Sequence, residues 1–214
     1  MSVLAPSSQD RWLDLNDLLR DLVALGILDQ SNAEQALTMR RSSANSKLHP
    51  LEFIAAQQFE DLSRPGRRLD LETLTAWLAQ QCGQPYMRID PLKINVASVT
   101  PLMSYAFAQR HKILAVAVDR ESVTIASAQP YVRSWEADLT HVLKLPIKRV
   151  VANPTDIQRL AVEFFRLAKS VSGASSVDQK MSSMGNFEQL LNLGASDQEP
   201  DANDAHIVNI VDWL

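Results

Sequence analysis

The chain has 214 residues, of which 46% are hydrophobic and 21% charged, and its formal net charge is −4. These proportions are typical of a globular protein with a substantial core. The 21 basic residues are dispersed, which argues against nucleic-acid binding, and a single cysteine excludes an internal disulfide. Apolar runs fall short of the ~20 residues that cross a bilayer, and no signal peptide is recognisable. A cytoplasmic protein without direct membrane insertion is expected.

Residues 14–84 are predicted to form a helical subdomain, after an N-terminal stretch (1–13) that is expected to be disordered. Asp14 is a suitable N-cap for the first helix. Apolar residues then recur at helical spacing and predict its buried face: Leu15, Leu18, Leu19, Leu22 and Val23. Gly26 can adopt the positive φ that ends a helix, so the chain is expected to turn back there.

Three more helices are predicted in this subdomain. Ser31 begins an S-x-x-E pattern, a capping box that would open a second helix at about 32–41. Pro50 is placed as the first residue of a third helix. Asp70 is a cap for a fourth helix, which Gly83 would end. The pattern predicts two helical hairpins in succession.

From residue 85 to 169 the sequence alternates between strand and helix patterns. Four short apolar runs are predicted strands, and the second and third are close enough to form a β-hairpin: "YMRI", "ILAVAV", "SVTIASA" and "IKRVVA". The clearest helix in the chain follows, with Asn153 as its cap and Pro154 at its first position. Strands and helices interleaved at this spacing predict a small layered α/β subdomain, so the fold class is α/β (α+β).

The remaining residues break this pattern. Residues 170–203 are rich in serine and acids and are predicted to be a flexible linker. Within it, a short amphipathic stretch carries Phe187, Leu190 and Leu191, which suits either a docking peptide or a helix packed on its own domain. Residues 204–214 begin another amphipathic helix and stop, as a truncated start of a further domain would.

Sequence motifs for catalysis are absent. The four histidines lie far apart, so no metal site is expected, and Cys82 has no recognisable base nearby and is interpreted as a structural thiol. The segment nearest to a Walker A loop, "GASSVDQK", has Asp178 where the second glycine must stand. We therefore expect no catalytic residue, no metal and no cofactor in this chain.

Three segments in this order resemble the N-terminal region of the GspE/PilB family, the ATPases of type II secretion and type IV pilus assembly. They are the opening hairpin from Asp17 to Leu37, the stretch "LDLETLTAWLAQQCGQPYMRIDPLKINV", and "FAQRHKILAVAVDRESVTIASAQP" with the strand and helix after it. The resemblance implies that the chain is the front part of a longer protein. ATP, Mg²⁺ and hexamer formation would then belong to a downstream motor domain.

The resemblance also implies a partner. In this family the N-terminal region couples the motor to the cytosolic domain of an inner-membrane platform protein, which would place the chain at the membrane periphery. Apolar side chains from the first helix and from the linker are the predicted partner interface: Leu15, Leu18, Leu22, Phe187, Leu190 and Leu191. A non-catalytic adaptor is the leading hypothesis, and two packed subdomains without an independent ligand are the plainest alternative.

In the MshE-like branch of the family, paired hairpins bind cyclic di-GMP through an R-L-G start and a final glutamine. Aligned on Gly26, Asp17 stands at the arginine position, Leu19 at the glycine position and Arg40 at the glutamine position. An aspartate would repel a phosphate, and a leucine side chain would block close approach to the backbone.

The second hairpin copy has lost the same groups. Pro50, Glu52 and Phe59 stand where arginine and two glycines are expected, and the copy ends intact at Gln81. No nucleotide site is therefore expected. The alternative hypothesis is a cyclic di-GMP-sensing module with altered ligand residues, in which Arg40, Gln81 or the arginine-rich loop at 64–68 has been recruited.

Overall fold

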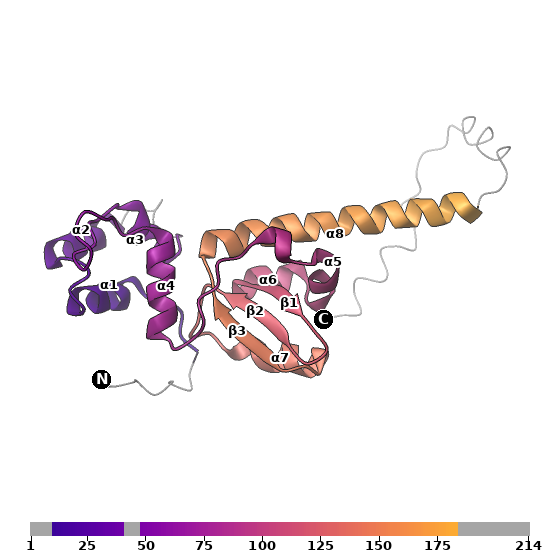
Figure 1. Cartoon of the computed structure of the whole chain (residues 1–214), viewed down its shortest axis with the longest axis horizontal. Helices are drawn as coiled ribbons and strands as arrows, with labels where there is room; N and C mark the ends of the chain where they lie inside the picture. The colour runs from indigo at the N-terminus through magenta and orange to yellow at the C-terminus, as the bar shows by residue number, and fades with distance from the viewer. Residues whose placement is uncertain (1–9, 41–47, 184–214) are drawn as a thin grey trace, which may run out of the picture. The chain divides into compact units, whose positions relative to one another are not determined.

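The computed structural model describes residues 10–40 and 48–183, with side chains as far as residue 171. The chain divides into two compact units, Met1–Ser170 and Val171–Leu214. In chain order (Figure 1) its elements are α1 (Leu15–Ala24), α2 (Gln30–Arg40), α3 (Pro50–Ala56), α4 (Leu71–Gln81), η1 (Pro91–Lys93), α5 (Val96–Val99), η2 (Thr100–Leu102), α6 (Tyr105–His111), β1 (Ile113–Val118), β2 (Val123–Ser127), α7 (Ser134–Leu143), β3 (Ile147–Val151) and α8 (Pro154–Ser183).

The first helix begins and ends as predicted. The carboxylate of Asp14 accepts hydrogen bonds from the amides of Asn16 and Asp17, at 2.8 and 3.3 Å. At the other end Gly26 has φ +66°, and the amide of Ile27 donates to the carbonyl of Leu22 at 2.9 Å. This is the hydrogen-bond pattern of a helix closed by a left-handed residue.

The capping box predicted at Ser31 is wrong, and α2 begins at Gln30, two residues before the predicted start at about residue 32. The amide of Ser31 donates to the carboxylate of Asp29 at 2.9 Å, so Asp29 provides the capping group. A capping box occurs instead at α3, between His49 and Glu52. The local pattern offered two competing caps, and the carboxylate is the stronger acceptor.

Helices α1–α4 enclose one hydrophobic core, to which the first unit's sheet also contributes. The largest fully buried side chains in it are Leu19, Leu22, Leu28, Leu51, Phe53, Ile54, Leu69, Leu74 and Leu78. Val151, the last residue of β3, belongs to this core as well. The end of the sheet is thus packed among the helices.

The sheet has three strands in the order β1-β2-β3. Strands β1 and β2 are antiparallel, and β2 and β3 are parallel. The β1–β2 hairpin and the third strand confirm the sequence prediction. The strand predicted at "YMRI" is wrong, because Tyr86 forms only an isolated bridge with Val151. A run of four residues is too short to distinguish a strand from an extended segment beside one.

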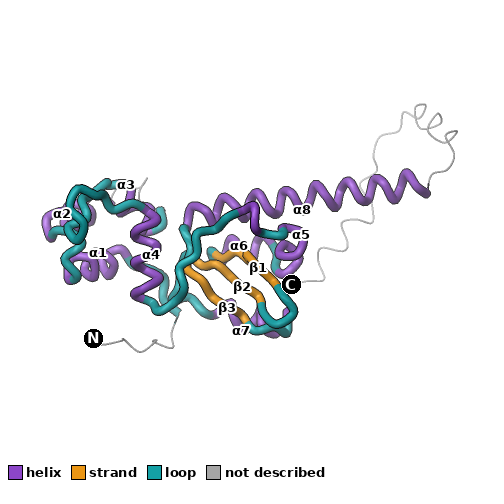
Figure 2. Tube along the Cα trace, in the orientation of Figure 1, coloured by secondary structure: helices purple, strands orange, loops and turns teal. Residues whose placement is uncertain are grey.

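Helices surround this sheet (Figure 2). The first four residues of β1 are all buried, and so are residues of β2 that point to opposite faces, which requires cover on both faces. The core combines the strands with Trp135 and Leu139 of α7 and with Leu160 and Phe164 of α8. The predicted fold class, a helical subdomain followed by a small layered α/β subdomain, is confirmed.

The helix that begins beyond Asn153 is confirmed, with the amide of Thr155 donating to Oδ1 of Asn153 at 3.0 Å. It continues to Ser183, however, so the linker predicted over 170–203 is helical in its first part. The predictions for the rest of that linker and for 204–214 lie outside the described residues. In the described part of the chain, no helix combines the length and hydrophobicity needed to span a membrane.

Candidate functional site

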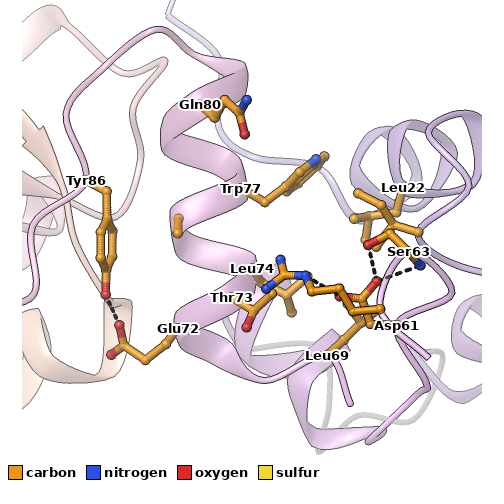
Figure 3. A pocket seen from close by; sticks show the side chains of 13 residues that line it. Leu22, Asp61, Ser63, Leu69, Glu72, Thr73, Leu74, Trp77, Gln80 and Tyr86 are labelled. Atoms are coloured by element: carbon orange, nitrogen blue, oxygen red, sulfur yellow. Dashed lines mark hydrogen bonds and ion pairs between the residues drawn. The ribbon is translucent and has the colours of Figure 1, made fainter. Parts of the chain in front are cut away.

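A cavity of about 460 Å³ lies beside α4. We call it the α4 groove. Figure 3 shows Trp77, Thr73 and Gln80 projecting from α4 beside it, with Leu22 of α1 across from them. Ile27, from the turn after α1, and residues of the loop before Leu69 complete the wall. The groove therefore forms where the first hairpin meets the α4 helix.

Polar groups in the α4 groove are held by neighbours. Asp61 is buried, accepts from the amide of Ser63 at 2.9 Å and pairs with Nε of Arg64 at 3.3 Å. On the other side of α4, the hydroxyl of Tyr86 donates to Glu72, as Figure 3 shows. Burial, reinforced by Glu72, raises the pKa of Tyr86 to about 12, so the hydroxyl keeps its proton at neutral pH. These groups are structural, and none is arranged as an acid–base pair for catalysis.

Two exposed leucines are adjacent in sequence to residues that line the α4 groove, and we call this pair the apolar rim. Leu62 lies between Asp61 and Ser63 and is 47% exposed, and Leu25, two residues before Ile27, is 52% exposed. Large apolar side chains around a concave surface are typical of protein-binding sites. The sequence analysis missed this rim, although one signal was available: Leu25 and Leu62 stand in turns, where the helical pattern gives them no buried position.

The partner-interface prediction needs correction for α1. Leu15, Leu18 and Leu22 are at most 5% exposed and pack in the core of the helical layer. They are unavailable to a partner because the apolar face of α1 packs in one core with residues of α2, α3 and α4. Phe187, Leu190 and Leu191 lie outside the described residues.

A second cavity, of about 320 Å³, lies where α3, α6 and the start of α8 come together. We call it the Arg40 cavity. Arg40 and Lys112 supply two positive charges and Glu52 one negative charge, with Gln158 and Trp12 also on the wall. The guanidinium of Arg40 donates to the carbonyl of Leu48 at 3.0 Å and lies 5.1 Å from the ring centre of Phe53. Arg40 was predicted from its motif position, but nothing in the sequence places Lys112 near it.

His49 lies at the inner end of the Arg40 cavity and joins the two layers. Its Nε2 lies 3.0 Å from the carbonyl oxygen of Ala128, and its Nδ1 accepts from the amide of Leu51 at 3.3 Å. These contacts require a proton on Nε2 and none on Nδ1, so the ring is neutral. Burial lowers the pKa of His49 to about 4, which agrees with that assignment.

Glu52 is engaged on both oxygens. It accepts from the amide of His49 at 3.2 Å and from the hydroxyl of Thr155, at the start of α8, at 2.8 Å. Its charge stands on the wall of the Arg40 cavity. An anionic ligand in this cavity would therefore meet the Glu52 carboxylate as well as Arg40 and Lys112.

Gln81, the other predicted nucleotide residue, is exposed and lines a different and much smaller cavity, of about 20 Å³. Asp17 lines it too, and pairs with Arg20 at 2.8 Å and with Arg11 at 3.4 Å. That volume holds about one water molecule. The structure thus keeps Arg40 and Gln81 in separate cavities, and only the first has room for a ligand.

Metal-binding clusters are absent from residues 10–40 and 48–171, whose side chains are described and where no three His, Cys, Asp or Glu side chains converge. Cys82 is half-buried, and burial raises the pKa of its thiol, which suits a structural residue.

Comparison with known proteins gives one family and several relatives. Residues 82–171 match the MshEN domain family, so the match covers the α/β subdomain and leaves the opening hairpin outside. The chain is 35% identical over 203 residues to the type IV pilus assembly ATPase TfpB of Acinetobacter baylyi. The alignment covers 94% of this chain and 34% of that protein, so the chain spans about a third of the length of this curated relative.

Two solved structures are similar at low identity. A structure of MshE with cdg is 18% identical, with a TM-score of 0.44, and the match covers 71% of this chain and 99% of that one. A structure of the N-terminal domain of XpsE is 16% identical, with a TM-score of 0.42, and the match covers 71% and 96% of the two chains.

Proposed function

Since the chain carries an MshEN domain over residues 82–171 and is homologous to a type IV pilus assembly ATPase, we propose that it is a non-catalytic N-terminal adaptor of such an ATPase. In this role it docks the motor on the cytosolic domain of an inner-membrane platform protein. ATP hydrolysis and hexamer formation belong to a motor domain. The adaptor works at the cytoplasmic face of the membrane, through its partner.

The observation that carries this proposal is the α4 groove with its apolar rim. Leu62 and Leu25 are about half exposed, and Trp77 and Ile27 line the wall. A groove of this kind suits an amphipathic helix, whose apolar face enters while its polar residues meet the rim. Asp61 and Glu72 outnumber Arg64 among the charged lining residues, so a partner helix with basic flanking residues fits best.

Isothermal titration calorimetry of the chain with the platform's cytosolic domain tests this proposal. Leu62→Asp should weaken binding at least tenfold, because it places a charge at an apolar contact. Val142→Asp is the matched control, since Val142 is 70% exposed on α7 and distant in sequence from the groove. No heat of binding at tens of micromolar would overturn the docking role. Equal affinity of both variants and the parent chain would exclude the α4 groove as the docking surface.

A second candidate function is cyclic di-GMP sensing at the Arg40 cavity. It is favoured by one observation, that Arg40 and Lys112 line the same cavity as the indole of Trp12. Cations suit the phosphates, and an aromatic ring suits stacking of a guanine. Glu52 opposes it, because its carboxylate is fixed on the same wall.

Calorimetry with cyclic di-GMP distinguishes the two functions. If the cavity binds the nucleotide, Lys112→Ala should weaken binding severalfold, while Lys144→Ala should not. The two lysines are matched, because each is the left-handed residue that ends a helix, with φ of 54° and 53°. Absence of heat with the parent chain would end the second candidate and leave the adaptor role untouched.

A further inference from the structure

The segment just before α1 is tied to a helix far along the chain. The carboxylate of Asp10 accepts hydrogen bonds from the amides of Arg133 at 2.7 Å and Ser134 at 3.0 Å, at the start of α7. The residue at the N-cap position of α7, Arg133, makes no capping hydrogen bond with its own side chain. Asp10 therefore provides the cap that the local sequence of α7 lacks.

Two further contacts hold the same segment on the α/β subdomain. The amide of Leu13 donates to Oε1 of Gln129 at 2.8 Å, and Gln129 itself is buried. The guanidinium of Arg11 lies 4.6 Å from the ring centre of Tyr131, in a cation–π contact. Residues 10, 11 and 13 thus each contact a different residue between 129 and 134.

The segment also forms part of the Arg40 cavity. Trp12 and Leu13 line that cavity, opposite residues from α3, α6 and α8. Trp12 is 52% exposed, so its ring is not part of the core. Removing residues 10–13 from their present position would open one wall.

We propose that residues 10–13 form a releasable strap over the Arg40 cavity, which the hydrogen bonds of Asp10 hold to the start of α7. The strap is releasable because its anchor is exposed and consists of a few hydrogen bonds, and segments held by few contacts open locally at low cost. Closing the strap completes both the cap of α7 and the wall of the cavity. A molecule that occupies the cavity against Trp12 is consequently coupled to the start of α7, and the coupling is reciprocal. The strap needs no particular ligand to exist.

Amide hydrogen exchange of the full chain, read by NMR, tests whether the strap opens as one unit. Asp10→Ala should speed exchange of the amides of Ser134 and Leu13 together, by about 2- to 30-fold, the range expected for loss of an N-cap. Gln129→Ala should also speed hydrogen exchange of the Ser134 amide, although Gln129 does not contact Ser134. Asp10→Asn should restore slow exchange, because asparagine is an equally good cap.

Asp90→Ala is the matched control, since Asp90 caps η1 through the amide of Leu92 at 3.1 Å and lies outside the strap. It should leave Ser134 and Leu13 unchanged. Ser134 exchange that responds to Asp10→Ala but not to Gln129→Ala would overturn the strap, because its contacts would then open independently.

Thiol labelling tests whether the strap covers the cavity. Ala161 is buried and lines the Arg40 cavity, and Cys82 is the chain's single cysteine. In a Cys82→Ser, Ala161→Cys chain, the added Asp10→Ala change should raise the labelling rate at least fivefold, while added Asp90→Ala should not. Equal labelling rates with and without Asp10 would show that the segment does not close the cavity, and would overturn the proposal.

Discussion

Nε2 of His49, at the start of α3, donates a hydrogen bond to the carbonyl oxygen of Ala128, just beyond the end of β2, across 3.0 Å. This bond joins the helical layer to the sheet. Because Nδ1 accepts from the amide of Leu51, the ring has no acceptor for a second proton there. Protonation of His49 at Nδ1 would therefore break the hydrogen bond that caps α3 and would place a charge at a buried position.

Stability should accordingly fall between pH 6.5 and pH 4. The pKa of His49 is about 4 in the folded chain and near 6.5 when unfolded, so the unfolded state takes up the proton first as pH falls. The contribution of His49 to the free energy of unfolding is fully present above pH 6.5 and is lost on acidification, with a magnitude on the order of 3 kcal/mol. Urea unfolding at pH 7 and pH 5 measures it.

His49→Gln should flatten that pH dependence. His111 is the control, because burial also lowers its pKa and adds a smaller slope of the same sign. His111→Gln should remove only that smaller part. A pH dependence that His49→Gln leaves intact would contradict the assignment of a neutral, buried ring.

Glu72 is expected to couple α4 to the start of α8. Its Oε1 accepts from Nδ2 of Asn153 at 3.0 Å, and its Oε2 accepts from the hydroxyl of Tyr86. A double-mutant cycle with Glu72→Ala and Asn153→Ala should give a coupling free energy of about 0.5–1.5 kcal/mol. The cycle is needed because Asn153→Ala also removes the cap of α8, which lowers stability independently of Glu72. Additive effects on the free energy of unfolding would refute the coupling.

Leu22→Ala should destabilise the chain by about 2–5 kcal/mol, because Leu22 is fully buried and the change leaves a cavity. Leu25→Ala, on an exposed neighbour, should change the free energy of unfolding by less than about 0.5 kcal/mol. Chemical denaturation of both variants checks this. A neutral Leu22→Ala change would contradict the burial of Leu22 in the helical core.

Gly26→Ala should cost about 1 kcal/mol, because Gly26 has φ +66° and an alanine there is strained. No atom lies within 4 Å of the added Cβ, so backbone strain alone would account for the loss. Gly26→Asn should cost less than Gly26→Ala, since asparagine tolerates this conformation better. The reverse order in thermal unfolding would show that the turn has another conformation in solution.

Much of the fold could be predicted because it depends on neighbours in sequence. Asp14, Asp70 and Asn153 cap their helices as predicted, and each accepts from an amide two or three residues ahead. The hairpin of β1 and β2 is equally local. Prediction failed where two local solutions competed, as with Asp29 and Ser31, or where an apolar run was too short to specify its partner, as at Tyr86.

The candidate sites were less predictable. The leucine pattern of α1 suits both a helix covered by a partner and a helix buried by its own chain. The structure shows that the chain itself buries these leucines. Arg40 could be named because it stands at a motif position, but its neighbour Lys112 comes from a different subdomain. Leu25 and Leu62 stand in turns and belong to no periodic pattern, so their position in turns was the one sequence signal of their exposure.

The helices, the hairpin, the family resemblance and the loss of the R-L-G groups could all be inferred from the sequence, because each depends on residue identity or on the spacing of a few residues. The tertiary structure alone decided three things: that Asp10 caps α7, that His49 is neutral against Ala128, and that Arg40 and Lys112 share a cavity. Each joins residues more than 70 positions apart. Such contacts form only when both layers have packed, because the burial that positions them is a property of the whole core and not of any segment.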